Sequence, residues 1–148
     1  MLAAGDAFPS FDLPADDGSR VSSHRLRGRT FLLYFYPKAD TPGCTREACA
    51  FRDNWSAAEA VGLQVFGVSF DTPDRNHRFR QRFQLPFPLL SDSDQALAKE
   101  VGAKLPLLPV PKRISYLIGT DGRVLKAYPV VRPRGHAAEV LADLARLS

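Results

Sequence analysis

An uninterrupted apolar run over residues 31–36, reading FLLYFY, most constrains the fold of this chain. The run has the length of a β-strand, contains no charged residue, and stops at Pro37. Hydrophobic runs of this kind are typical of strands that are covered on both faces of a sheet. The chain is therefore expected to form an α/β sandwich, with layers packed on both sides of a central sheet.

The rest of the sequence predicts the other elements of this sandwich. Thr41 is a candidate N-cap, and Pro42 suits the first turn of a helix that ends at Gly62. Residues 8–21 are expected to form two short strands around a turn. Further strands are expected at 63–70, 114–118 and 123–130, a short apolar step lies at 89–90, and further helices are expected at 73–83, 95–101 and 136–147. This order predicts an α/β protein with a thioredoxin-like fold, in which helices flank a central mixed β-sheet and a β-hairpin lies at the N-terminus.

The size and composition of the chain are those of a single globular domain. The chain has 148 residues, of which 45% are hydrophobic and 24% are charged, and one domain over residues 1–148 is expected. No apolar stretch approaches the roughly 18–20 residues that a membrane span needs. Residues 1–6 lack the charged start and apolar core of a signal peptide. A cytoplasmic protein with no membrane partner is therefore expected.

The charge of the chain gives little information about partners. Basic residues number 20 and acidic residues 16, and the small basic excess is spread along the sequence. The densest basic stretch, residues 75–82, is more typical of the solvated face of a helix than of a phosphate-binding patch. No nucleic-acid partner is expected.

The two cysteines, Cys44 and Cys49, are the clearest candidates for chemistry. Two cysteines cannot form a tetrahedral zinc site alone, and neither a metal nor a cofactor is expected. A structural disulfide is disfavoured in a reducing compartment. Their spacing therefore favours catalysis or redox sensing.

Cys44 lies in the first turn of the expected helix, where free N–H groups and the helix dipole favour an anion. A thiol reacts as its thiolate, and a thiol with an ordinary pKa of about 8.5 is only slightly ionised at neutral pH. Thr41 can direct its hydroxyl toward the thiolate or an incoming oxygen, and Pro37 would form a wall that excludes water. Because the exclusion of water disfavours the thiolate, a fixed cation is expected nearby.

Several segments resemble one family of thiol enzymes. Residues 35–45, reading FYPKADTPGCT, strongly resemble the active-site segment of peroxiredoxins, whose signature is Pro-x-x-x-Thr/Ser-x-x-Cys. With Cys49 and residues 51–53, the match is similar to the peroxiredoxin Q branch, also called bacterioferritin comigratory protein. Residues 5–9, 87–92 and 113–118 add weaker similarity in the right order. The resemblance implies a thiol peroxidase that reduces hydrogen peroxide and organic hydroperoxides.

The resemblance also implies a role for each matching residue. Cys44 matches the peroxidatic cysteine, which attacks the O–O bond and becomes a sulfenic acid. Thr41 matches the hydroxyl that holds the peroxide, and Pro37 matches the residue that shields the pocket. Arg113 matches the active-site arginine, which would be the required cation. Glu47 is expected to orient Arg113.

The resemblance assigns Cys49 as the resolving cysteine, which would attack the sulfenic acid and form an intramolecular disulfide. Cα atoms five residues apart in a helix are about 8.6 Å apart. A disulfide cannot bridge Cα atoms beyond about 7 Å without backbone movement. The helix is therefore expected to unwind between Pro42 and about Phe51 on oxidation. Thioredoxin or a similar dithiol is the implied reductant, acting on a monomer or weak homodimer.

Two other functions fit parts of the sequence. A disulfide reductase or isomerase could use the same fold, but its usual Cys-x-x-Cys motif is missing. A non-enzymatic binding protein, either redox-sensing or associated with nucleic acid, would show a steep dependence of DNA binding on salt. Turnover of peroxide with a reductant distinguishes the peroxidase from both.

Overall fold

In a computed structural model, which describes residues 1–147, the chain forms seven strands and five helices. The elements in chain order are β1 (Asp12–Pro14), β2 (Arg20–Ser22), β3 (Phe31–Phe35), α1 (Pro42–Asp53), α2 (Trp55–Ala60), β4 (Gln64–Ser69), α3 (Pro73–Phe83), β5 (Leu89–Ser91), α4 (Ala96–Glu100), β6 (Ser115–Ile118), β7 (Val124–Tyr128) and α5 (His136–Leu147). None of the helices within residues 1–147 combines the length and apolar character that crossing a membrane requires.

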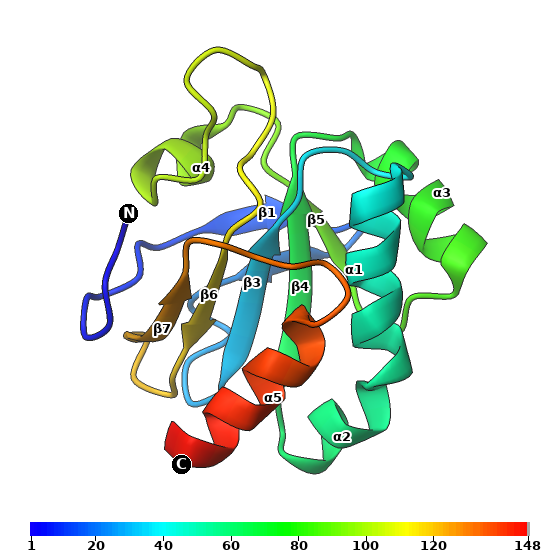
Figure 1. The fold of residues 1–148 in the computed structure, drawn as a ribbon. Coiled ribbons are helices and arrows are strands. Elements are labelled where there is room, and N and C mark those ends of the chain that lie inside the picture. The colour runs from blue at the N-terminus through cyan, green and yellow to red at the C-terminus, as the bar shows by residue number, and fades with distance from the viewer. Residues whose placement is uncertain (148) are drawn as a thin grey trace.

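The larger sheet is mixed and has β3 at its centre (Figure 1). Its strand order is β5-β4-β3-β6-β7. β3 and β5 each run parallel to β4, whereas β6 runs antiparallel to β3 and β7 antiparallel to β6. The expected α/β architecture with a thioredoxin-like arrangement is confirmed.

The residues of β3 point alternately into two separate hydrophobic cores. Phe31, Leu33 and Phe35 pack in the core that also holds side chains of β1 and α4. Leu32 and Tyr34 pack in the opposite core, beneath α1, α3 and α5. Both faces of the central strand are therefore covered, as its uninterrupted apolar sequence predicts.

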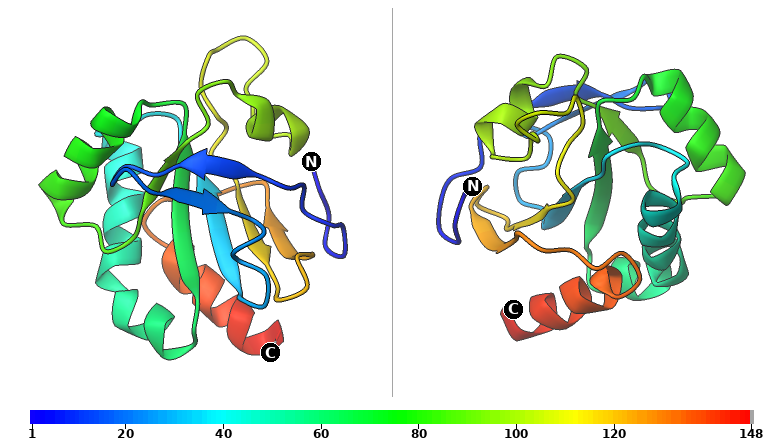
Figure 2. Two further views of the ribbon diagram at one scale, coloured as in Figure 1. Left: turned by 180° about the vertical axis from the view of Figure 1, so that it is seen from behind. Right: turned by 45° about the horizontal axis from the view of Figure 1, so that its top comes forward.

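The expected N-terminal hairpin is confirmed and covers one face of the sheet. β1 and β2 pair antiparallel, with Leu13 opposite Val21. The Ala15 N–H donates to the Ser19 carbonyl at 2.8 Å and closes the turn. Figure 2 shows from behind that the hairpin crosses the face of the sheet opposite α5.

The prediction of one continuous helix up to Gly62 is wrong, because the helix breaks at Asn54. Asn54 has φ −104° and ψ 13°, which separates α1 from α2. Its side-chain amide donates to the Ala50 carbonyl at 2.8 Å. The Asn54 N–H donates to the same carbonyl at 3.2 Å, so the backbone bond is kept and the side chain is a second donor to it. Asparagine side chains that bond backbone carbonyls in this way support non-helical backbone angles.

Candidate active site

Cys44 lies in the first turn of α1 and is 1% exposed. Thr41 is the N-cap residue of α1 and has an extended backbone. The Thr45 N–H donates to the Thr41 carbonyl at 2.8 Å, which is the first backbone hydrogen bond of the helix. The amides of Gly43 and Cys44 precede this first bond and so have no acceptor within the helix. The thiol therefore lies beside the positive end of α1.

Arg113 reaches Cys44 from a distant part of the sequence. Its Nη2 lies 3.4 Å from the Cys44 Sγ, and its Nη1 donates to Glu47 Oε1 at 2.8 Å. The guanidinium is largely buried, with 20% of the side chain exposed. A Cβ atom at Gly43 would lie 2.9 Å from Arg113 Nη2, so the absence of a side chain there permits the close approach.

The proline-rich segment 103–112 delivers Arg113 to this position. It forms a loop closed by hydrogen bonds from the Lys112 N–H to the Ala103 carbonyl, at 2.6 Å, and from the Leu105 N–H to the Val110 carbonyl, at 3.2 Å. The loop projects beyond the end of the sheet in Figure 1. β6 begins two residues after Arg113, which anchors the arginine to the central sheet.

Glu47 lies one turn after Cys44 on α1 and is fully buried. Burial raises the pKa of Glu47 to about 7, although the adjacent Arg113 guanidinium acts in the opposite direction. Burial also lowers the pKa of Arg113, but Cys44 and Glu47 outweigh it and the net shift is upward. The pair therefore holds a positive charge next to the thiol.

The other predicted site residues lie on α1 or just before it. Pro37 is half-buried in the β3–α1 loop, residues 36–41. The Thr41 hydroxyl donates to the Lys38 carbonyl at 2.7 Å and makes no capping bond to α1. Cys49 lies further along the intact α1, half-buried, and both thiols are free. The structure thus joins Cys44, Glu47 and Arg113 by direct contacts, while Cys49 occupies a separate turn.

Sequence reasoning missed a group of polar residues behind the β3–α1 loop. Thr72 caps α3, which leaves Asp71, the residue before it, outside the helix. Asp71 instead accepts a hydrogen bond from the Ala39 N–H at 2.8 Å. The signal available in the sequence was an acidic residue directly after a buried strand, because carboxyl ends of parallel strands meet at one edge of a sheet.

No group of three or more metal-binding side chains occurs within residues 1–147. The site consists instead of a buried thiol, an arginine that contacts it, and a carboxyl group that contacts the arginine. Chemically, this arrangement favours a nucleophilic thiolate and can stabilise negative charge on a leaving oxygen.

Comparisons with known proteins agree with this chemistry. Residues 4–127 match the AhpC/TSA family. A protein of Coxiella burnetii, named putative peroxiredoxin bcp, is 40% identical over 149 residues, covering 97% of this chain and 99% of that protein. The crystal structure of peroxidoxin BcpB from Mycobacterium tuberculosis has a TM-score of 0.92 at 32% identity, covering 100% of this chain and 99% of that chain. A structure of Xanthomonas campestris bacterioferritin comigratory protein, whose subject is alkyl peroxide reduction, has a TM-score of 0.87 at 28% identity, covering 100% and 98% of the two chains.

Proposed function

The chain belongs to the AhpC/TSA family, in its peroxiredoxin Q and Bcp branch, and we propose that Cys44 carries its thiol peroxidase activity. The observation that most supports this role is the 3.4 Å contact between Arg113 Nη2 and the buried Cys44 Sγ. A permanent cation at this distance favours the thiolate. Peroxide and a thiol reductant are the substrates of this reaction.

In the first step, the Cys44 thiolate attacks one oxygen of a hydroperoxide and the O–O bond breaks. The other oxygen takes a proton and leaves as water or an alcohol, and Cys44 becomes a sulfenic acid. Arg113 stabilises the negative charge that develops on the leaving oxygen. Thr41 holds the peroxide, Pro37 shields the pocket from water, and Glu47 keeps the guanidinium oriented.

In the second step, the Cys49 thiol attacks the Cys44 sulfenic acid, releases water and forms a disulfide. A thioredoxin-type dithiol then reduces this disulfide and becomes a disulfide itself. Such reductants are maintained in the cytoplasm, where we expect the protein to act. Because both cysteines belong to one chain, a monomer or weak homodimer is sufficient.

Rapid-quench mass spectrometry tests both cysteine roles. Fully reduced protein is mixed with one equivalent of hydrogen peroxide, alongside Cys49→Ser. The expected wild-type product has lost two hydrogens, whereas Cys49→Ser accumulates a sulfenic acid that a dimedone probe traps. Oxidation no faster than that of an ordinary free thiol would refute the role of Cys44. A wild-type protein that accumulates the sulfenic acid as Cys49→Ser does, without losing two hydrogens, would refute the role of Cys49.

The second step also requires α1 to open. The two cysteines are five residues apart in an intact helix, where standard geometry separates their Cα atoms by about 8.6 Å. We therefore expect the oxidised protein to lose helical structure in the first part of α1 while the sheet is retained. Amide hydrogen exchange of the reduced and oxidised forms checks this. A disulfide formed with the protection of α1 unchanged would contradict the proposal.

A further inference from the structure

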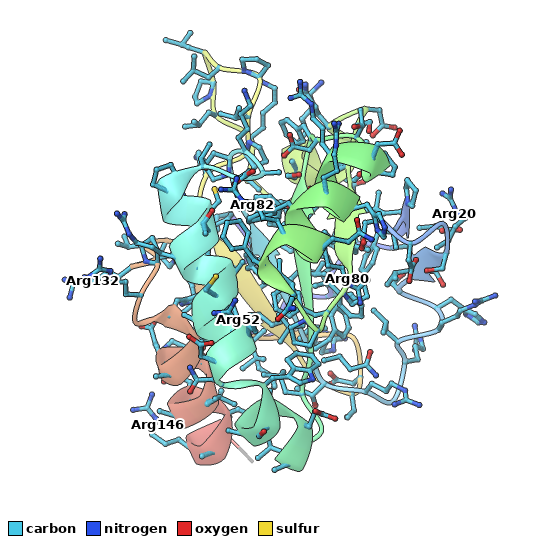
Figure 3. The ribbon with its side chains drawn as sticks, turned by 90° about the vertical axis from the view of Figure 1, so that its right-hand side faces the viewer. Arg20, Arg52, Arg80, Arg82, Arg132 and Arg146 are labelled. Carbon is cyan, nitrogen blue, oxygen red and sulfur yellow. The ribbon has the colours of Figure 1, made fainter. Side chains whose placement is uncertain are left out.

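The backbone of the β3–α1 loop is unfavourable at Asp40, whose φ is 61°. Glycine adopts this left-handed conformation readily and aspartate occasionally, and surrounding groups hold a loop that contains a non-glycine residue there. The Asp40 carboxylate pairs with Arg82 of α3 at 2.7 Å, at the surface of the molecule. Figure 3 shows Arg82 between α1 and α3.

Close packing holds the loop only in part, through Ala39, which lies against the core beneath α1, α3 and α5. A cavity separates the loop from α3, and its lining includes Ala39, Asp40 and Asp71 together with Arg75 and Arg78 of the helix. This cavity is open to solvent, so α3 does not pack along the whole length of the loop. Hydrogen bonds therefore supply the directional restraint on the middle of the loop.

Two hydrogen bonds tie the loop to one polar network on β4 and α3. At the start of the loop, the Tyr36 hydroxyl donates to Asn76 Oδ1 at 2.5 Å. In its middle, the Ala39 N–H donates to Asp71 Oδ2 at 2.8 Å. Ser69 lies between these attachment points: its hydroxyl donates to Asp71 Oδ2 at 2.9 Å and lies 3.4 Å from Asn76 Oδ1. Asn76 and Ser69 are completely buried, so the network forms a rigid support.

Asp71 does not cap α3, although it lies just before that helix. The Thr72 side chain caps that helix by accepting a hydrogen bond from the Arg75 N–H at 3.3 Å. The Asp71 N–H in turn donates to the Ser69 Oγ at 3.2 Å, which orients Asp71 from behind. Its carboxylate is thus directed at the amide of the loop.

We propose that Asp71 is a positioning residue for the peroxide step, which holds the β3–α1 loop so that Thr41 meets the peroxide at Cys44. This inference rests on the proposed function of Thr41 and Cys44. Asp71 contacts the loop at Ala39, two residues before Thr41, and has its effect only through this contact. Cys44 itself is held separately, by α1 and by Arg113. Loss of Asp71 therefore disturbs the placement of the peroxide and leaves the reactivity of the thiol in place.

Two reactions of Cys44 separate these effects. Both reactions are followed in a Cys49→Ser background, where Cys44 is the single thiol. The reaction with hydrogen peroxide needs the loop to place Thr41, whereas alkylation by iodoacetamide, which also has to reach the buried thiol, does not use the Thr41 hydroxyl. Asp71→Ala should slow the peroxide reaction about 10-fold and leave the alkylation rate nearly unchanged, because a displaced substrate-holding group costs rate without altering the nucleophile. Asp71→Asn keeps an oxygen acceptor for the Ala39 N–H and should recover most of the peroxide rate. Asp74→Ala, an exposed change in the first turn of α3, is the matched control and should match the wild type.

The proposal fails if Asp71→Ala reacts with peroxide at the wild-type rate. It fails equally if both reactions slow by the same factor, since that result would indicate a general structural role. Slow peroxide oxidation of the wild-type protein would instead overturn the proposed function itself. If Asp71→Ala does not fold, Ser69→Ala provides the test, because it removes the donor to the Asp71 carboxylate and should slow the peroxide reaction selectively.

Discussion

At Gly43, the absence of a side chain determines how close Arg113 comes to the thiol. A Cβ atom there would lie 2.9 Å from Nη2 and 3.6 Å from Cζ of Arg113, and the first of these distances is a steric clash. The clash involves the end of a flexible side chain, so the fold can relieve it by moving the guanidinium. The guanidinium would then lose its contact with the Cys44 Sγ.

We therefore expect Gly43→Ala to slow the reaction of Cys44 with peroxide and to leave the thermal stability of the protein unchanged. The peroxide reaction should slow by about 10- to 100-fold, because a displaced charge no longer stabilises the leaving oxygen. Stopped-flow oxidation by hydrogen peroxide measures this rate, and thermal unfolding measures stability. Gly135→Ala, where an added Cβ has no neighbour within 4 Å, is the matched control. An unchanged peroxide rate in Gly43→Ala would show that Arg113 tolerates the displacement.

At the scale of one element, α1 carries a buried carboxyl group that makes its opening sensitive to pH. Oε2 of Glu47 is buried and has no hydrogen-bond partner within residues 1–147. Burial raises the pKa of Glu47 from 4.5 to about 7. When α1 opens, this carboxyl reaches water and its pKa returns to the lower value. The closed helix therefore binds a proton more tightly than the open one, and it loses stability as the pH rises through this range.

Glu47→Gln should remove this pH dependence. In the wild type, the free energy of opening α1 is expected to fall by about 2 kcal/mol from pH 5 to pH 8, whereas the side-chain amide of the variant has no proton to lose. Amide protection factors in α1, corrected for intrinsic exchange, measure the opening. Glu59→Gln on the exposed side of α2 should keep the wild-type dependence. The same pH dependence in Glu47→Gln and wild type would exclude Glu47 as its source.

The sequence predicts elements well where local chemistry decides them. The apolar pattern of residues 31–36 identifies β3, and the helix expected at 73–83 coincides with α3. The break between α1 and α2 was not predictable, because nothing local in the sequence distinguishes an asparagine that stays helical from Asn54, whose ψ of 13° leaves the helix. Arg113 was assigned only through family resemblance, since no local pattern links it to Cys44. The position of Asp71 directly after a buried strand was a signal that it faces this edge of the sheet, but its partner is the Ala39 backbone amide, which no side-chain pattern in the sequence identifies.

At the scale of the whole molecule, a buried carboxylate joins the hairpin layer to the rest of the fold. Asp16 Oδ1 accepts the Leu89 N–H of β5 at 3.0 Å and an Arg80 N–H at 3.2 Å, and Oδ2 contacts the His77 ring at 3.0 Å. The side chain of Asp16 is completely shielded from solvent. The hairpin packs on the face of the sheet opposite Cys44, so this junction serves the assembly of the layers.

Asp16→Ala should therefore lower stability without altering the chemistry. It removes the acceptor of the buried Leu89 N–H and one of the acceptors of the Arg80 guanidinium, which should cost about 2 to 3 kcal/mol in the free energy of unfolding. Urea unfolding measures this loss, and the peroxide rate of the folded variant should equal that of the wild type. Asp17→Ala, which changes the more exposed neighbour, should have little effect. A loss of peroxide rate in the folded Asp16→Ala protein would show that the two faces are coupled.

The placement of both cysteines on the single helix α1 sets the reaction order of the proposed resolution step. Cys49 reaches the oxidised Cys44 by a movement within one chain, so the step is unimolecular. Its half-time is then the same at any protein concentration, because no encounter between two molecules is involved. The capture of a second peroxide by Cys44, in contrast, accelerates with peroxide concentration. Whether an oxidised Cys44 forms the disulfide with Cys49 or is irreversibly oxidised therefore depends on the concentration of peroxide and not on the concentration of the enzyme.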